Sequence, residues 1–370
     1  MENKIGMTAT TLQNWLEQKE NVAVLDVRPK EQREEWQIPG STYVDAYQRL
    51  NANDPSVLDE ITIPENVPVV IVCAAGRTSQ IAADKLRKKG IEAYSLEGGM
   101  KAWSMAWNTA TITFDDFKVL QFRRTGKGCL SYILISENEA AIVDASLPLE
   151  AYEQVLSENR LTVKFVMDTH IHADHLSRSK QLAEKFNVPL YLPAQNKIAF
   201  TFKPLTDDVS LSLGHVSIKP INTPGHTLES TSYLIDEKIL LTGDTLFIDS
   251  IGRPDLKAST EEAKQKAGLL FYSLQKLITL DDSIIVLPGH TSKPVEFNNI
   301  PIQASLASIK QNVSMLRLGE DEFVETILQR IPPTPPNYLA IVEKNISGNY
   351  DDVNPEELEA GANRCAISSI

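Results

Sequence analysis

The sequence predicts an α/β protein built from two domains, and three observations support this prediction. A chain of 370 residues is too long for one ordinary hydrophobic core. Short apolar runs, typical of buried strands, alternate with amphipathic segments that are typical of helices. This pattern is interrupted between residues 103 and 116. We therefore expect a first domain at 1–108, a linker at 109–116 and a second domain at 117–370.

The composition argues against several classes of function. The net charge of -13 disfavours binding to nucleic acid or to anionic membrane surfaces. No apolar run approaches the length of a membrane span. The three cysteines lie far apart and do not resemble a disulfide framework, so we expect a cytoplasmic protein. A homo-oligomer is compatible with the sequence.

The first domain contains a cysteine at the end of a buried strand. Apolar runs at 21–28 and 68–72 predict two strands, and residues 79–89 predict a helix with a Ser or Thr N-cap. A short loop that starts with Cys73 joins the second strand to this helix. Loop N–H groups and the helix dipole would stabilise negative charge on the Cys73 sulfur, and Arg77 adds positive charge. Such a cysteine is a nucleophile that can carry a second sulfur atom, although the loop alone equally fits a small buried residue.

The motifs around this cysteine resemble the single-domain rhodanese family in order and spacing. They are Asp26-Val27-Arg28, Ile38-Pro39-Gly40-Ser41, Cys73-Ala74-Ala75-Gly76-Arg77-Thr78-Ser79, Leu96-Glu97-Gly98-Gly99 and Trp103. The resemblance implies a compact domain with a parallel sheet and flanking helices, and a sulfurtransferase whose cysteine becomes persulfidated. Many rhodaneses carry basic residues where this loop has Ala74 and Thr78, so the loop here is less positively charged.

The second domain is organised around the stretch Thr169-His170-Ile171-His172-Ala173-Asp174-His175. It follows the apolar run 165–167, which predicts a buried strand. Other predicted strands end in similar residues, His226, Asp244 and His290. Strand ends of this kind gather ligands at one edge of a sheet, and imidazole with carboxylate suits zinc, iron or manganese. Runs of strands, then helices, then more strands predict a sheet sandwich with helices outside.

The order His-x-His-x-Asp-His, Gly-His, Gly-Asp, Gly-His over residues 115–295 resembles the metallo-β-lactamase fold. The resemblance implies an αββα sandwich. We expect helices at 174–186 and 261–278, and a helical C-terminal extension with helices at 302–316 and 322–331. Fold alone does not set the reaction, because this family includes zinc hydrolases, flavoproteins and iron dioxygenases.

A narrower motif, Gly252-Arg253-Pro254-Asp255, resembles the persulfide dioxygenase branch of that family. This branch implies one Fe(II) ion held by His170, His226 and Asp244, a set that leaves open positions on the metal. We expect Arg253 and Asp255 to form an ion pair that supports the loop of Asp244, the alternative being a surface salt bridge. The residues expected to orient the ligands are His172, Asp174, His175 and His290.

The resemblances together imply oxidation of a low-molecular-weight thiol persulfide by O₂ to thiol and sulfite. The first domain would supply or remove sulfane sulfur, with thiosulfate as a product when sulfite accepts it. The catalytic candidates are therefore Cys73, Arg77 and Asp174. The residues after His290 depart from those of glutathione-using relatives, so a thiol other than glutathione is a candidate carrier of the persulfide. Arg364 could meet the anionic groups of such a carrier.

Two other functions fit the same residues. A dinuclear zinc thioester hydrolase of glyoxalase II type would hold a second metal at Asp174, His175 and His290, with Asp244 as the bridge. A non-catalytic persulfide carrier or sensor would need no turnover at all. Of the remaining thiols, Cys129 is expected in the core, and Cys365 has no assigned role.

Overall fold

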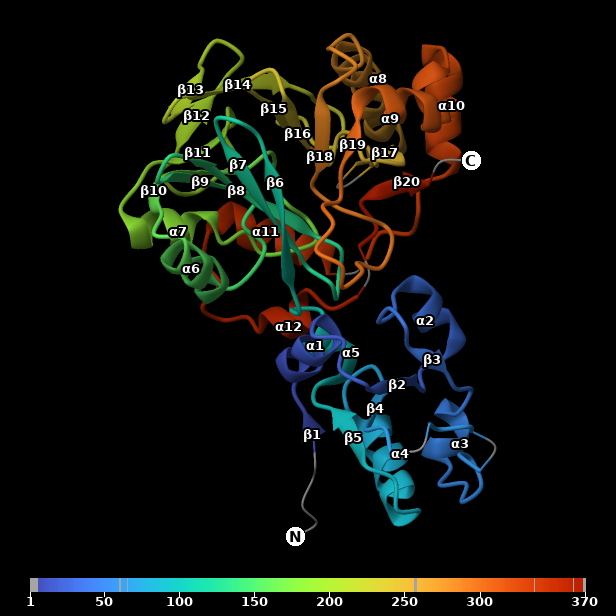
Figure 1. Ribbon diagram of the computed structural model, residues 1–370. Helices are drawn as coiled ribbons and strands as arrows, with labels where there is room; N and C mark the ends of the chain where they lie inside the picture. Colours follow the sequence, from blue (N-terminus) through green and yellow to red (C-terminus); the bar gives the residue numbers. More distant parts are fainter. Residues whose placement is uncertain are drawn as a thin grey trace.

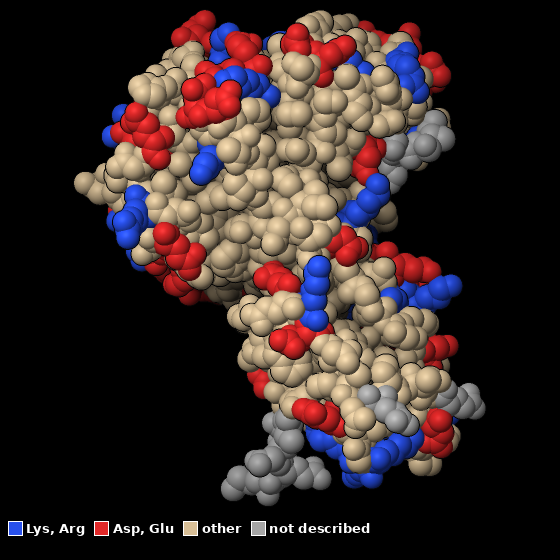
Figure 2. Space-filling view, viewed as in Figure 1, with Lys and Arg blue, Asp and Glu red and all other residues tan. Residues whose placement is uncertain are grey.

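The computed structural model describes residues 6–59, 61–64, 66–255, 258–335, 337–361 and 363–368. It shows a smaller N-terminal domain, blue to cyan, below a larger C-terminal domain (Figure 1). The molecule narrows where the two domains meet, and acidic and basic side chains are interspersed over the face shown (Figure 2). Within the described ranges, no helix is long and apolar enough to cross a membrane.

The N-terminal domain is a five-stranded parallel sheet with helices on both faces, as expected. The strand order is β1-β5-β4-β2-β3. The strands are β1 (Gly6–Met7), β2 (Ala23–Asp26), β3 (Thr42–Tyr43), β4 (Val69–Val72) and β5 (Ala93–Leu96). The helices are α1 (Ala9–Glu17), α2 (Lys30–Glu35), α3 (Tyr47–Asn51), α4 (Arg77–Lys88) and α5 (Gly99–Trp103). The central strand β4 is wholly apolar and buried, as parallel strands covered on both faces are.

Helix α4 starts earlier than the sequence predicts. Its N-cap is Gly76 in the left-handed conformation, with φ 84°. Glycine adopts this turn at no steric cost, so the helix begins at Arg77. Thr78 and Ser79, predicted as caps, lie buried in the first turn instead.

The C-terminal domain is the expected αββα sandwich. One sheet has the order β12-β11-β10-β9-β8-β7-β6, the other β13-β14-β15-β16-β18-β19, and β17 pairs separately with β20. The strands of the first sheet are β6 (Asn108–Thr113), β7 (Lys118–Arg123), β8 (Leu130–Ser136), β9 (Glu139–Val143), β10 (Thr162–Met167), β11 (Leu190–Pro193) and β12 (Lys203–Leu205). Those of the second are β13 (Leu211–Leu213), β14 (Val216–Asn222), β15 (Thr231–Ile235), β16 (Ile239–Gly243), β18 (Ile285–Pro288) and β19 (Ala304–Ser305). The pair is β17 (Ser250–Gly252) and β20 (Ala366–Ser368).

Three apolar layers hold this domain together. Side chains from both sheets, among them Phe165 and Tyr233, form the central layer. Helices α6 (Leu149–Glu158) and α7 (Ser179–Phe186) pack on the first sheet. Helices α8 (Thr260–Leu277), α9 (Leu306–Asn312) and α10 (Glu320–Gln329), with the 3₁₀ turn Ser314–Arg317, cover the second sheet. Helices α11 (Tyr338–Ser347) and α12 (Pro355–Leu358) complete the C-terminal extension.

Three predicted segments differ from the structure. The linker predicted at 109–116 contains most of β6, which pairs antiparallel with β7 and buries Ala110 and Ile112 on one face. The helix predicted from Asp174 begins only at Ser179, because the Asp168 carboxylate accepts the Ser177 and Ser179 hydroxyls and holds the preceding loop open. The helix predicted at 302–316 is shorter, because residues 304–305 pair with β18.

The two domains are joined by polar contacts as well as by the chain. The Trp36 indole N–H donates to the Thr125 carbonyl at 3.1 Å. The buried Arg124 guanidinium donates to the Ser104 carbonyl. Near the C-terminus, Arg364 pairs with Glu35 of α2 at 2.5 Å. The C-terminal segment therefore contacts the N-terminal domain.

Candidate metal centre and cysteine loop

The predicted ligand residues meet at one edge of the sandwich. His170 to His175 follow β10, while His226, Asp244 and His290 follow β14, β16 and β18. All of these histidines and aspartates are buried. Gly243 permits the close approach, because a Cβ there would lie 2.4 Å from the Thr169 hydroxyl and its φ is +49°. The strand ends thus bring residues from four parts of the chain into one cage.

Five side-chain atoms of these histidines and aspartates have no hydrogen-bond partner, among them His172 Nδ1 and His175 Nε2. Three of the five are grouped together: Nε2 of His170, Nε2 of His226 and Oδ2 of Asp244. The carboxylate oxygen lies 3.8 Å from the first nitrogen and 3.5 Å from the second. Buried polar atoms are rarely left unpaired, and these three are grouped closely enough to hold one metal ion. The donor set of two imidazoles and one carboxylate therefore fits a metal.

Hydrogen bonds on the opposite ring nitrogens orient the two imidazoles. The His226 Nδ1–H donates to the Arg253 carbonyl at 2.8 Å. The His170 Nδ1–H faces the Thr169 hydroxyl at 2.9 Å, and that hydroxyl donates to both oxygens of Asp144. These bonds leave each Nε2 lone pair free for a metal. Asp144 itself has the unusual φ of 54°, a strained conformation of the kind found at functional sites.

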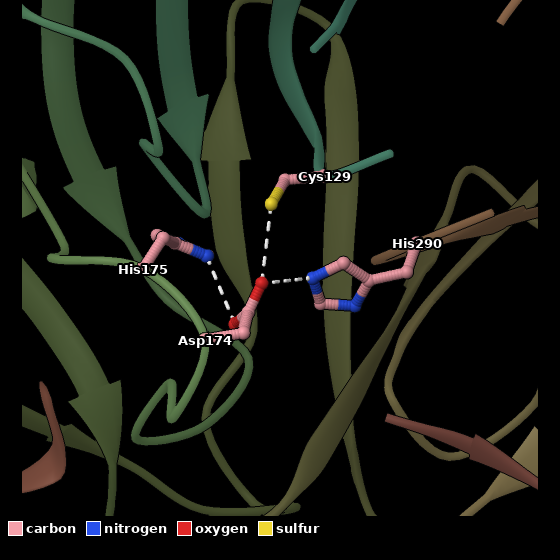
Figure 3. Close-up of side chains that lie close together, drawn as sticks. All are labelled: Cys129, Asp174, His175 and His290. Carbon is pink, nitrogen blue, oxygen red and sulfur yellow. Dashed lines mark hydrogen bonds and ion pairs between the residues drawn. The ribbon is translucent and has the colours of Figure 1, made fainter. Parts of the chain in front are cut away.

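Asp174 lies at the centre of a second group of side chains, which we call the Asp174 group and which includes Cys129, His175 and His290 (Figure 3). Its carboxylate lies 3.1 Å from the Cys129 thiol, 3.1 Å from His175 Nδ1 and 2.8 Å from His290 Nε2. His290 Nδ1 lies 2.5 Å from Asp244. Although burial raises the pKa of Asp174 and Asp244, the charge of His290 holds both well below the usual range. Burial lowers the pKa of His290, but the two carboxylates raise it well above its ordinary value.

The ring of His172 lies beside that of His170, with centroids 4.3 Å apart, and its Nδ1 has no hydrogen-bond partner. Its Nε2 lies 3.2 Å from Asp144. Burial lowers its pKa, but the hydrogen bond and charge of Asp144 outweigh burial and raise the pKa of His172 to about 9. The Nε2 contact ties His172 to Asp144, the same carboxylate that accepts from the Thr169 hydroxyl beside the candidate ligand His170.

The predicted Arg253–Asp255 ion pair forms, and it is not a surface pair. Two nitrogens of Arg253 each lie 2.7 Å from an Asp255 oxygen, and the arginine side chain is 0% exposed. The same guanidinium donates to the carbonyls of Arg364 and Pro332. The Arg253 carbonyl accepts from His226, so the pair fixes the loop behind a candidate metal ligand.

The C-terminal segment completes the cage, through residues other than the Arg364 that the sequence analysis singled out. The Asn363 amide donates to Asp174 at 3.1 Å. The Cys365 sulfur groups with ligand atoms of Asp244 and His290, all within 4.8 Å of one another. Burial and the charges of Asp244 and Asp174 raise the pKa of this thiol. The Arg364 side chain, predicted to meet a substrate, pairs with Glu35 instead.

In the N-terminal domain, the loop that starts with Cys73 surrounds the sulfur atom of that residue with polar groups. The Gly76 N–H donates to the Cys73 sulfur at 3.1 Å, and the Ser79 hydroxyl lies 3.2 Å from it. Ser95 lies 2.8 Å behind Ser79. Arg77 is exposed at the start of α4. One loop N–H therefore donates to the sulfur, as the sequence predicts, and the Ser79 hydroxyl adds a contact that the sequence analysis did not include.

A cavity of about 440 Å³ adjoins the loops that carry the ligands. Ile171, Ala173 and Thr227, each next to a histidine of the cage, contribute to its wall. Leu228, Leu269 and Val342 add apolar surface. This cavity is a natural approach for a small substrate.

Sequence reasoning missed several residues of the site. Cys129, predicted to lie in an apolar core, contacts Asp174 instead. Asp144 directly follows β9 and could have been found by the strand-end argument that identified Asp244. No sequence signal places Asn363 or Cys365 in the cage, because both are brought there by the pairing of β20 with β17.

Fold and site together define a metal-binding αββα protein joined to a cysteine-loop domain. The sequence pattern of the metallo-beta-lactamase superfamily matches residues 124–290, and that of the rhodanese-like domain matches residues 8–106. The probable metallo-hydrolase YqgX of Bacillus subtilis is 31% identical over 181 residues, 43% of this chain and 83% of that protein. The chain belongs to the metallo-beta-lactamase superfamily and carries a rhodanese-like domain.

Other comparisons agree with this assignment. A hydroxyacylglutathione hydrolase of Brucella ovis is 32% identical over 163 residues, 43% of this chain and 60% of that protein. A metallo-beta-lactamase structure from Staphylococcus aureus is 26% identical with a TM-score of 0.58, covering 66% of this chain and 75% of that one. ETHE1 from Myxococcus xanthus has a TM-score of 0.54 at 24% identity, covering 66% of this chain and 100% of that one, and shares the fold.

Proposed function

We propose that the protein is a persulfide dioxygenase with a sulfurtransferase domain. The reaction is R–S–SH + O₂ + H₂O → R–SH + H₂SO₃, in which the terminal sulfur is oxidised and O₂ is reduced. The observation that carries the proposal is the group of three unpaired, buried ligand atoms of His170, His226 and Asp244. Two histidines and one carboxylate are the donor set typical of ferrous oxygenases.

The surrounding residues prepare this set for one ion. Thr169 and the Arg253 carbonyl fix the two rings, so that little reorganisation is needed on binding. A ferrous ion bound here would supply redox chemistry toward O₂ and positions for the persulfide sulfur. The burial of all three ligands excludes bulk water, which would otherwise compete for those positions.

The hydrogen bonds of Asp174 and His290 oppose a second metal ion, while the unpaired Nε2 of His175 is the one atom of the Asp174 group left free for it. Asp174 accepts from Cys129, His290 and Asn363 on a single oxygen, and His290 uses both ring nitrogens on carboxylates. A second ion at Asp174 would replace these bonds. Hydrogen bonds to charged groups are worth about 1.5–3 kcal/mol each, so their loss opposes the second ion.

The N-terminal domain would handle sulfane sulfur. The Gly76 N–H and Ser79 hydroxyl hold the Cys73 sulfur, and the same donors suit the terminal sulfur of a Cys73 persulfide. We infer that this persulfide gives its sulfur to sulfite, forming thiosulfate, or to the thiol that the metal site uses. The three cysteines are free thiols, which suits the reducing cytoplasm.

A zinc thioester hydrolase is the second candidate. Cys129, Asp174, His175 and His290 also group closely enough to hold an ion. The relative from Brucella ovis is named a hydroxyacylglutathione hydrolase, which supports this alternative. Such an enzyme would need two metals, with Asp244 between them.

The test is oxygen uptake by the iron-loaded full chain given glutathione persulfide or coenzyme A persulfide. Uptake should match sulfite formation, and Asp244→Ala or His170→Ala should abolish both. His215→Ala is the matched control, because this exposed histidine pairs with Glu137 and should behave as the unaltered protein. Iron-loaded protein that consumes no O₂, but hydrolyses thioesters with two zinc ions bound, would establish the second candidate instead.

A further inference from the structure

A thiol that the proposed reaction does not use lies at the candidate metal centre. Cys365 is 1% exposed and lies directly before β20. Its sulfur groups with ligand atoms of Asp244 and His290 within 4.8 Å. Asp244 also carries the unpaired Oδ2 that faces the two candidate ligand nitrogens. The thiol therefore lies beside the carboxylate that carries one of the unpaired ligand atoms.

The other thiol of the cage is held differently. Cys129 donates to Asp174 at 3.1 Å and is fixed in the Asp174 group (Figure 3). The Cys365 sulfur has a longer contact, 3.7 Å to the Tyr338 hydroxyl. The Cys365 backbone is well fixed, since its N–H donates to Asn363 and its carbonyl accepts from Arg253. The main chain thus places a weakly bonded sulfur next to the metal ligands.

The segment that carries Cys365 also reaches the N-terminal domain. Arg364 pairs with Glu35 of α2. Ala360 and Gly361 line a cavity of about 340 Å³ together with Ala74, the neighbour of Cys73. The same stretch of chain therefore runs from the cysteine loop to the metal cage.

We propose that Cys365 accepts sulfane sulfur at the metal centre, so that the protein forms a persulfide of its own there. The Cys365 sulfur attacks the terminal sulfur of R–S–SH and forms a new S–S bond. The S–S bond to R breaks, its electron pair leaves with the R–S sulfur, and the Cys365 proton goes to that sulfur to give R–SH. Nothing is oxidised overall, and no free thiolate has to persist beside Asp244.

This inference rests on the proposed function, because it places the acceptor beside the site of persulfide oxidation. A persulfide held on Cys365 would be positioned by the fold rather than by a diffusing thiol, and such preorganisation accelerates reaction. It would also make the metal site tolerant of the identity of R, since R–SH departs before oxidation.

The first test measures sulfur uptake without oxidation. The full chain carrying Cys73→Ser, free of metal and O₂, is treated with sodium tetrasulfide, alkylated and digested. Mass spectrometry should find one added sulfur on the peptide of Cys365, and none on that of Cys129. Absence of sulfur on Cys365, in a preparation whose Cys73 parent does take up sulfur, would overturn the proposal.

The second test uses the iron-loaded enzyme with limiting glutathione persulfide. Cys365→Ser should slow sulfite formation by roughly tenfold or more, because the preorganised acceptor is lost. An unchanged rate would overturn the acceptor role and leave the dioxygenase assignment intact. If the parent protein consumes no O₂ but Cys365 still gains sulfur, the dioxygenase assignment fails and the acceptor site stands.

Discussion

The Thr169 hydroxyl offers a direct test of how the candidate ligands are oriented. It faces His170 Nδ1 at 2.9 Å and donates to the Asp144 carboxylate. Thr169→Val keeps the shape of the side chain but leaves the ring N–H and Asp144 Oδ2 without partners. Each buried unsatisfied group costs about 1–3 kcal/mol, so the free energy of unfolding of the metal-free protein should fall by about 2–6 kcal/mol.

The same substitution should weaken metal binding. Loss of a group that orients a ligand costs about 10–100-fold in metal affinity, or about 1.4–2.8 kcal/mol. Chelator competition measures the affinity, and urea unfolding of the metal-free protein measures the stability. Thr223→Val is the matched control, because its buried hydroxyl contacts Ser232 and Thr245 and no candidate ligand. It should lower stability only. If Thr169→Val binds iron as tightly as the parent, Thr169 does not set the orientation of His170.

Two further predictions follow from buried charges. Arg253→Met leaves Asp255, 15% exposed, without its partner and should lower the free energy of unfolding by about 3 kcal/mol. Arg49→Met, which breaks an exposed pair, should cost far less in the same urea titration. In the folded protein the pKa of His172 is raised from 6.5 to about 9, so protonated His172 stabilises the fold. This contribution is complete below pH 6.5. That contribution, about 3 kcal/mol, should be lost as the pH rises through 9. Asp144→Asn should remove this decline in the metal-free protein; an identical pH profile would contradict the pairing of His172 with Asp144.

Local patterns were enough to predict the fold and most of the cage. Strand β4 is a continuous apolar run and β10 ends in one, at residues 165–167. The candidate ligands come within a few residues of strand ends, so both features are visible in short stretches of sequence. Strand β6 was missed because threonines alternate with its buried residues, as in an edge strand. That alternation is easily taken for a polar linker.

Features that depend on long-range packing were not predictable. His290 bridges Asp174 and Asp244, residues 116 and 46 positions away, and no local motif encodes that geometry. Cys365 and Asn363 enter the cage only because β20 pairs with β17. The late start of α7 likewise depends on hydrogen bonds from Ser177 and Ser179 to Asp168, the residue directly after β10.

The number of metal ions per chain tests the central claim most directly. The metal-free full chain would be loaded anaerobically with excess Fe(II), and in parallel with Zn(II), and its bound metal counted after desalting. We predict one ion per chain, lost in His226→Ala and retained in His175→Ala. Two ions per chain, with the second lost in His175→Ala, would contradict a single site formed by His170, His226 and Asp244.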